Sequence, residues 1–322
     1  MGRRILRLGF SYLFVLATAL LINFAIPRVM PGSPFIHSGE GAGGAPLFMS
    51  SATLGSLEGY FGLGLPLSVQ LQRYLTGLAR LDLGVSITYR APVSELLLDR
   101  APWTLLLTVS ALLLNLGTVL LFGTGARSGK DRIVLFAAII LESMPPFALA
   151  GLLLVLLGVK LPLFPVGGAC SPLSDREGFR WAADVLHHAA LPVLVLSTQG
   201  LFSGLMVVRN SLGMARGEPS VLMAELKGLS PRIIRYRYVL RLALPPVVSF
   251  YSLRIAFMAS GAIFVEVVFA YPGLGRLMYE AVSSHDYPLA QGVFLAFTLW
   301  VLIVNFVTDC LYPKLDPRVE DT

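Results

Sequence analysis

The chain has 322 residues, of which 55% are hydrophobic and only 14% are charged, and its net charge is +6. Soluble domains carry about 25% charged residues, so this composition excludes a large soluble core and indicates an integral membrane protein. The positive excess then reflects where Lys and Arg lie relative to the bilayer, and it requires no nucleic-acid partner.

Six long apolar segments predict six transmembrane helices, because about 20 apolar residues cross a bilayer. Their approximate ranges are 8–27, 102–123, 133–157, 189–208, 246–269 and 289–311. The first segment is longer than the apolar region of a cleaved signal peptide, so we expect it to be retained. In the third segment, Pro145-Pro146 predicts a bend.

The distribution of basic residues predicts the orientation. An even number of spans places both termini on one side, and the segment 209–246 on that side contains seven of the 25 Lys and Arg residues. The positive-inside rule therefore predicts cytoplasmic termini. The segments 28–101 and 159–188 are then external, and the spacing of apolar residues from Gln70 to Gly84 predicts a helix in the first of them.

The basic segment 209–246 has signals for a short helix of its own. Glu218-Pro219 is typical of a helix start and Gly228 of a helix end. A second helical run is expected over 232–243, with Pro245-Pro246 beginning the fifth span. A short helix held between two anchored spans can transmit a partner's motion as a rigid body. The alternative is a basic helix that lies on anionic lipid.

Ten short motifs follow one another along the chain. They are Arg4–Arg7, Met30–Pro34, Leu81–Ser86, Pro92–Leu96, Pro102–Leu105, Phe164–Gly168, Lys227–Ser230, Phe269–Leu277, Asp286–Pro288 and Leu315–Arg318. In this order they resemble the permease subunits of ATP-binding-cassette importers, and most of all the dipeptide/oligopeptide/nickel class. The resemblance runs nearly from end to end.

The resemblance implies an all-α polytopic membrane protein with six transmembrane helices, the type I importer permease fold and cytoplasmic termini. It divides the chain into 1–95, with the first span and a long external loop, and 96–322, a five-helix core with a coupling loop at 209–245. It also implies a multi-pass location in the bacterial inner membrane.

The implied function is half of an ATP-driven import pathway for peptides or similar small solutes, without enzymatic activity in this chain. The implied partners are a second homologous permease subunit, two cytoplasmic ATP-binding subunits, an extracytoplasmic solute-binding protein and membrane lipid. No cofactor is expected in this chain, since ATP and Mg²⁺ would bind to the ATPase subunits. Gly125–Lys130 does not satisfy the Walker pattern, which needs Gly where Thr124 stands and Ser or Thr where Asp131 stands.

The resemblance also implies a set of residues that couple the permease to its ATPases. They are Glu218, Leu222, Met223, Ala224, Lys227, Gly228, Ser230 and Pro231. The family motif is Glu-Ala-Ala, three residues and then Gly, and its first two positions are Leu222 and Met223 here. We therefore expect a more apolar contact than the family's, without the salt bridge of its glutamate.

Ionisable side chains at membrane depth are costly and usually face a cavity or a partner. Glu142, Arg254 and Glu266 are such residues. We hypothesise that they line the translocation pathway, where Glu142 and Arg254 pair or contact the termini of a zwitterionic substrate. The alternative is a structural pair between the third and fifth spans.

Other functions stay open at this point. An ion-coupled secondary transporter would need broken helices and intramembrane acids in matching halves, and only the third span has a visible interruption. A membrane anchor or assembly subunit would need no pathway. Nickel is a possible substrate in place of peptides, although the adjacent His187 and His188 point apart on a helix.

Overall fold

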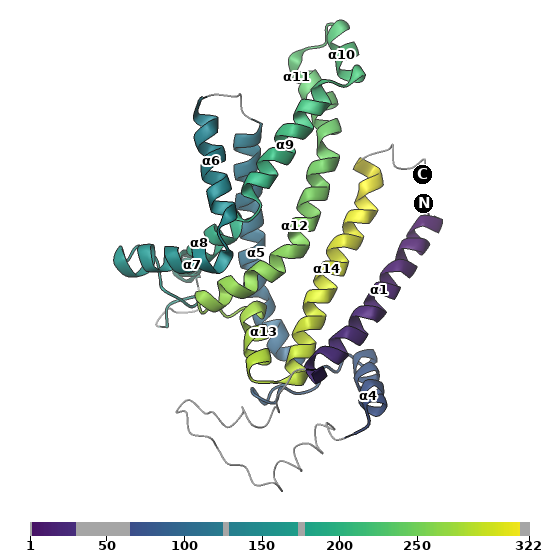
Figure 1. Cartoon of the computed structure of the whole chain (residues 1–322), viewed down its shortest axis with the longest axis vertical. Coiled ribbons are helices and arrows are strands. Elements are labelled where there is room, and N and C mark those ends of the chain that lie inside the picture. The colour runs from purple at the N-terminus through teal and green to yellow at the C-terminus, as the bar shows by residue number, and fades with distance from the viewer. Residues whose placement is uncertain (1, 30–64, 125–128, 173–177, 316–322) are drawn as a thin grey trace.

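The computed structural model describes residues 2–29, 65–124, 129–172 and 178–315, and nearly all of them lie in helices (Figure 1). The helices are α1 Gly2–Val29, α4 Leu67–Ala79, α5 Val93–Gly123, α6 Gly129–Ser143, α7 Pro146–Leu153, η1 Leu154–Lys160, α8 Gly178–Thr198, α9 Leu201–Arg216, α10 Pro219–Leu226, α11 Pro231–Ile233, η2 Ile234–Val239, α12 Leu240–Val268, α13 Leu274–Ser283 and α14 Tyr287–Leu315.

The described residues contain four to six candidate spans, against the six predicted. Four helices are long and apolar enough to cross a membrane by themselves, namely α1, α5, α14 and the continuous helix from α11 to α12. Two bent pairs, α6 with α7 and η1, and α8 with α9, bring the number to six if each pair is counted as one span. The prediction of an all-α polytopic fold is confirmed.

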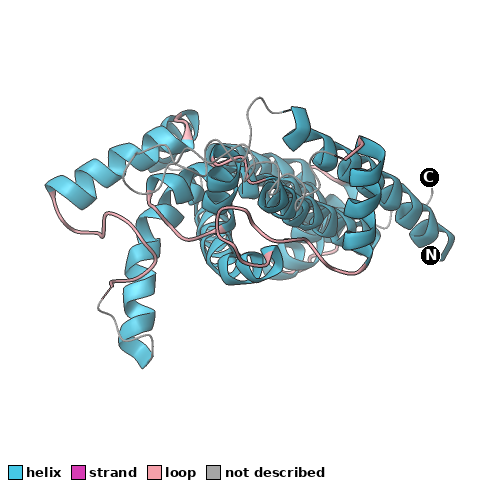
Figure 2. Ribbon diagram, turned by 90° about the horizontal axis from the view of Figure 1, so that it is seen from below, coloured by secondary structure: helices cyan, strands magenta, loops and turns pink. Residues whose placement is uncertain are grey.

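The predicted bend in the third span is sharp. Pro146 is at the start of α7, and the axis turns by 106° between α6 and the helix that follows. Proline cannot continue the hydrogen-bond ladder of the preceding helix, which explains the position of the turn. The segment from α7 to α8 consequently extends sideways from the bundle, as an arm on the left of Figures 1 and 2.

Two predicted boundaries are wrong. The fourth span is not one helix over 189–208, because Gly200 adopts a left-handed φ of 69° and the axis turns by 53° there. The fifth helix does not begin at Pro245-Pro246, since it runs unbroken from Pro231 through both prolines. Ala243 and Tyr251, on either side of the two prolines, are buried and hold the helix in place. The helix therefore accommodates both prolines without breaking.

Outside the spans, α4 confirms the helix predicted between Gln70 and Gly84, although it begins and ends a few residues earlier. The short helix α13 between the last two spans was not predicted. Span one packs against the last span, α14, and the central core is formed by α5, α8 and α12. Helix α10, the first residues of α1 and the last turns of α14 all lie toward the upper end of Figure 1. This agrees with the prediction that both termini and the basic segment lie on the same side of the membrane.

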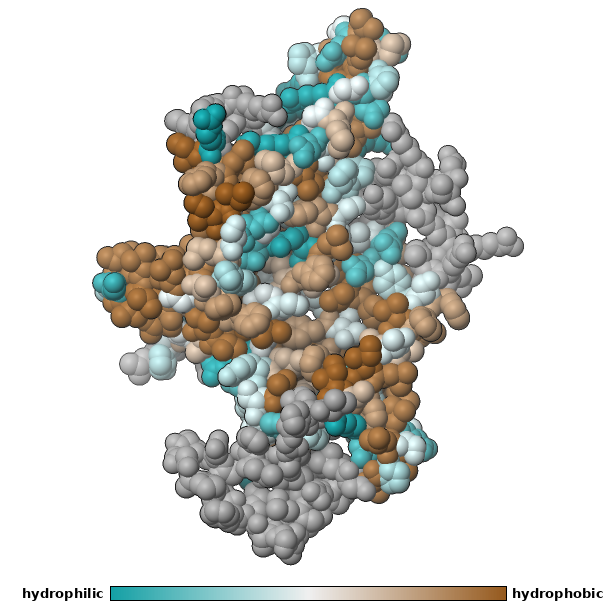
Figure 3. Space-filling view, in the orientation of Figure 1, coloured by the Kyte–Doolittle hydropathy of each residue, from teal (hydrophilic) through white to brown (hydrophobic). Residues whose placement is uncertain are grey.

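The surface of the bundle is apolar over large areas. Phe10, Leu13 and Phe14 on α1 are 61–74% exposed, and Figure 3 shows broad hydrophobic areas over α6 to α8. Apolar patches of this extent are rare on soluble monomers. They are consistent with a helix bundle whose middle part is surrounded by the lipid bilayer.

Candidate functional site

Helix α10 stands at the far end of a helical hairpin that projects beyond the other helices (Figure 1). Pro219 occupies its first turn, and Glu218 before it has extended backbone. At its other end Gly228 has φ 70°, and the N–H of Leu229 donates to the carbonyl of Ala224 at 3.2 Å. The helix start and end predicted from sequence are confirmed, since both depend on local backbone preferences.

One face of α10 packs into the hairpin. Val221 and Ala224 are 1% and 2% exposed, and they belong to a cluster with Ala215 of α9, Ile234 and Val239 of η2 and Ala243 of α12. This packing ties α10 to the two long helices that enter the membrane. Ala224 therefore lies inside the hairpin, where it supports the helix, and its side chain is not on the outer surface.

The opposite face of α10 is an exposed apolar patch made of Leu222, Met223 and Leu226. Their side chains are 57%, 53% and 75% exposed. Apolar side chains gathered at the tip of a hairpin, away from the apolar bundle surface, mark a protein-interaction site. The sequence predicted an apolar contact at Leu222 and Met223. Leu226 was not predicted, and it belongs to the same face of α10 because it lies one helical turn after Leu222.

The hairpin also carries exposed basic side chains. Arg216 on α9, Lys227 at the end of α10, and Arg232, Arg235 and Arg237 after it are all exposed. Ser230 begins the return helix, where its Oγ accepts a hydrogen bond from the N–H of Ile233 at 3.4 Å, and Pro231 follows in the first turn. The hairpin thus combines an exposed apolar patch on α10 with exposed basic residues on the helices beside it.

A second polar site lies at the break of the fourth span, deep in the bundle. The end of α8 leaves carbonyl groups without helical partners. Asn115 of α5 donates to two of them, at 2.6 Å to Ser197 and 3.3 Å to Gln199, and its own Oδ1 accepts from the Tyr251 hydroxyl at 2.9 Å. These contacts join α5, α8 and α12 at the break.

The start of α9 is capped by a carboxylate from another helix. Glu142 of α6 accepts hydrogen bonds from the N–H of Ser203, at 3.0 Å, and from its hydroxyl. An anion is stabilised at a helix N-terminus by the unpaired N–H groups and the helix dipole. Glu142 therefore has a capping role at the break.

Arg254 approaches the same break from α12. Its guanidinium lies so close to Gly200 that a Cβ on residue 200 would be 2.5 Å from Cζ of Arg254. The positive φ of residue 200 favours glycine, and any larger residue would also have to displace the Arg254 guanidinium. Glu142 and Arg254 do not form a direct ion pair among the described residues. In this conformation the two charges interact electrostatically without a direct ion pair, and both meet the broken fourth span. Whether they pair or contact a substrate stays a prediction.

Glu266 has a capping role as well. It is fully buried, and it accepts hydrogen bonds from Thr104 Oγ1 at 2.7 Å and from the N–H of Arg276 at 3.0 Å. The N–H of Leu274 donates to the same Thr104 oxygen at 2.7 Å. Glu266 and Thr104 together satisfy the first turn of α13, and in this conformation Glu266 is not accessible from outside.

The capping role of Thr104 predicts a measurable difference between two neighbouring threonines. Thr104→Val removes a donor and an acceptor from the buried start of α13, so we expect a loss of about 1–3 kcal/mol in stability. Thr108→Val is the matched control, because the Thr108 hydroxyl donates only to carbonyls of its own helix. Thermal unfolding of the two purified variants checks this, and equal stabilities would contradict the assigned role of Thr104.

On the outer side, two motifs distant in sequence meet at Asp286. This residue is fully buried, and it accepts hydrogen bonds from Ser86 Oγ at 2.6 Å and from the N–H groups of Thr88 and Leu289. It thereby caps α14 and holds the loop that precedes α5. Beside it, Tyr89 donates to Glu280, and burial together with this carboxylate raises the pKa of Tyr89 to about 12.

Sequence reasoning missed Asn115 and Ser203. Asn115 carries a signal, since it is an amide within the apolar segment 102–123, but only its contacts reveal that it closes the break of another span. Ser203 resembles any small residue of a packed helix. Among the described residues no three His, Cys, Asp or Glu side chains gather as metal ligands, and His37 lies outside those residues.

Comparisons with known proteins agree with this architecture. The sequence profile of a family described as "binding-protein-dependent transport system inner membrane component" matches residues 116–321. The chain is 29% identical to the oligopeptide transport system permease protein AppB of Bacillus subtilis, over 99% of this chain and all of that protein. It is 33% identical to the di/tripeptide transport system permease protein DppB of Pseudomonas aeruginosa over 93% of each. It is also 31% identical to the glutathione transport system permease protein GsiC of Salmonella paratyphi A, over 95% of this chain and 94% of that protein.

Proposed function

The chain belongs to the family of inner membrane components of binding-protein-dependent transport systems, and from this premise we propose that it imports peptides as one half of a translocation pathway. Three full-length relatives are named for the transport of oligopeptides, of di- and tripeptides and of glutathione. All three are peptides, so peptides are favoured over nickel.

The family function requires an ATPase partner and a binding protein. We propose the finer arrangement as well: a second homologous permease subunit completes the pathway, and two cytoplasmic subunits bind ATP and Mg²⁺, while this chain binds neither. An extracytoplasmic binding protein delivers the substrate to the outer face. The assembly sits in membrane lipid, and nucleic acid has no part in it.

The observation that carries the proposal is the α10 hairpin. Its exposed apolar patch of Leu222, Met223 and Leu226 offers a contact for an ATPase, and the opposite face is packed onto the ends of α9 and α12. A movement of the ATPase is therefore passed to both helices as a rigid body. Glu218, Lys227, Gly228, Ser230 and Pro231 shape or flank this contact, and Ala224 anchors it from inside.

We retain the pathway proposal for Glu142 and Arg254, in a changed form. Both charges lie at the break of span four, where a movement of α9 alters their surroundings. Glu266 is the weaker candidate, because its carboxylate is buried in the cap of α13. Broken helices also occur in ion-coupled transporters, but family membership favours a pathway driven by separate ATPases.

Co-purification and reconstitution test the proposed function together. The chain, its neighbouring permease and the ATPases are expressed together, purified and placed in liposomes with a binding protein. We expect ATP-dependent uptake of labelled peptides that needs all components. Uptake by this chain alone, driven by an ion gradient, would favour the ion-coupled alternative, and complex formation without any uptake would favour an anchoring subunit.

A further inference from the structure

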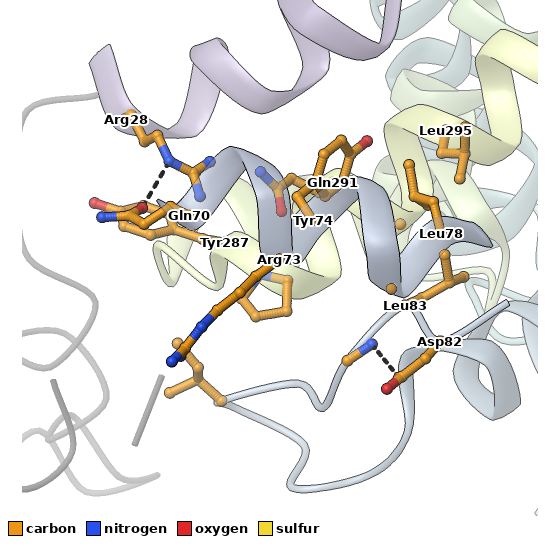
Figure 4. A pocket seen from close by; sticks show the side chains of 15 residues that line it. Arg28, Gln70, Arg73, Tyr74, Leu78, Asp82, Leu83, Tyr287, Gln291 and Leu295 are labelled. Carbon is orange, nitrogen blue, oxygen red and sulfur yellow. Dashed lines mark hydrogen bonds between the residues drawn. The ribbon is translucent and has the colours of Figure 1, made fainter. Parts of the chain in front are cut away.

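A small cavity lies between the end of the first span and the start of the last, on the side predicted to be external (Figure 4). Its volume is about 230 Å³. Its walls are formed by the last turn of α1, one face of α4, the loop that follows α4 and the first two turns of α14. It is far from α10 and from the break of span four, and the proposed import function does not use it.

The cavity lies at the boundary of the membrane. The apolar part of span one ends at Ile26, two residues before Arg28, and that of the last span begins at Tyr287. No residue of α4 is buried, and its Leu67 is 63% exposed. An amphipathic helix with exposed apolar residues beside a span lies at the level of the lipid headgroups, where Tyr side chains such as Tyr74 and Tyr287 also concentrate.

Two arginines give the cavity its positive charge. Arg28 donates to Gln70 Oε1 at 3.0 Å and to the carbonyl of Phe24 at 2.6 Å, and it lies over the Phe24 ring. A guanidinium has five N–H donors, so these contacts hold Arg28 in place and leave donors for a ligand. Neither Arg28 nor Arg73 forms an ion pair with a described acid.

Asp82 supplies the opposite charge. In Figure 4 it lies across the cavity from Arg28, where its Oδ1 accepts a hydrogen bond from the N–H of Gly84 at 2.9 Å. The cavity therefore separates positive charge at one wall from negative charge at the other. A ligand that carries an anion and a cation a few bonds apart matches this arrangement better than a simple anion.

The inner wall contains an amide whose nitrogen has no partner among the described residues. Gln291 is only 9% exposed, and no described residue accepts a hydrogen bond from its Nε2. Its backbone carbonyl is used, since it accepts from Asn23 at 2.9 Å, and Asn23 also contacts the Tyr74 hydroxyl. A buried unpaired donor costs free energy unless a ligand or water satisfies it, so Gln291 offers a hydrogen-bond donor to an occupant of the cavity.

We propose that this cavity binds the headgroup of a phosphatidylethanolamine from the outer leaflet. Its phosphate contacts Arg28 and Arg73, for which the planar guanidinium fork is well suited, and its ammonium group faces Asp82. Its acyl chains then extend beside α1 into the bilayer. A lipid is favoured over a soluble ligand because the cavity is lined by the ends of two spans and by the amphipathic α4, which we expect at headgroup level. Such a lipid would join α1 and α4 to α14.

Lipid retention in detergent tests the proposal on the complete transporter complex. Native mass spectrometry after stepwise delipidation should find one phosphatidylethanolamine held by the wild type. In Arg28→Gln/Arg73→Gln we expect the affinity for this lipid to fall at least tenfold. Arg80→Gln is the matched control, since Arg80 is exposed at the end of the same helix and does not line the cavity. It should behave as the wild type.

Two further arms identify the ligand chemistry. Asp82→Asn should remove the preference for phosphatidylethanolamine over phosphatidylglycerol while leaving lipid bound. Added phosphatidylethanolamine should raise the melting temperature of the wild type and of Arg80→Gln, but not that of the double variant. Size-exclusion chromatography first shows that the double variant forms an intact complex. Unchanged retention in the double variant would overturn the proposal. Equally tight binding of inorganic phosphate, glycerophosphoethanolamine or a dipeptide would overturn the lipid as its occupant.

Discussion

Replacing both Leu222 and Met223 by aspartate is expected to abolish transport by detaching the ATPase from the α10 hairpin. Both side chains are more than half exposed at the tip of the hairpin, so in the free chain the change should leave the fold intact. If each apolar side chain is buried in the ATPase, the pair contributes about 4 kcal/mol, or roughly a thousandfold in Kd.

The measurement is ATPase co-purification together with ATP-dependent peptide uptake. Met214→Asp is the control, because Met214 is equally apolar and 67% exposed on α9 but lies outside the tip. Leu226→Asp alone should weaken the ATPase contact by an intermediate amount, since Leu226 belongs to the same face. Normal co-purification of Leu222→Asp/Met223→Asp would show that the ATPase contact lies elsewhere.

Replacing Glu142 by leucine is expected to destabilise the protein by about 3 kcal/mol and to stop uptake. The substitution leaves the N–H of Ser203 without an acceptor and Arg254 without a nearby anion at the break of span four. Thermal unfolding of the purified variant measures the first effect. Ser203→Ala, which removes only the hydroxyl contact, should have a smaller effect of about 1 kcal/mol.

The glutamine variant separates a structural role from a role in the pathway. Glu142→Gln keeps an oxygen that accepts from the N–H of Ser203 but removes the charge. If Glu142 only caps α9, stability and uptake should stay within a few-fold of wild type. If its charge guides the substrate, uptake should fall strongly at nearly unchanged stability. Arg254→Gln is measured in parallel, and unchanged uptake in both variants would exclude the pathway role.

The division of the chain into 1–95 and 96–322 remains a prediction. Residues 30–64 lie outside the described part of the chain. Within the described part, α1 packs on α14 and the buried Asp286 binds the loop before α5, so the two portions are joined by specific contacts. A chain beginning at residue 96 would lose these contacts, and its expression and folding would test the division.

The features predictable from sequence were those that depend on local physics. Apolar length located the candidate spans, and Pro219 and Gly228 located the two ends of α10. The orientation drawn from the placement of Lys and Arg stays a prediction. These features can be predicted because hydrophobicity, charge and backbone φ are properties of single residues and short segments. The ordered motifs added the family, which the profile over residues 116–321 confirmed.

Only the tertiary structure decided what the membrane-depth charges do. Glu142 caps a helix start 61 residues away, and Glu266 binds a threonine 162 residues away. Gly200 breaks the fourth span, whereas Pro245-Pro246 does not break the fifth. A single sequence shows that a charge at membrane depth needs a partner. The identity of that partner depends on how distant helices pack together, which cannot be read from a short segment of sequence.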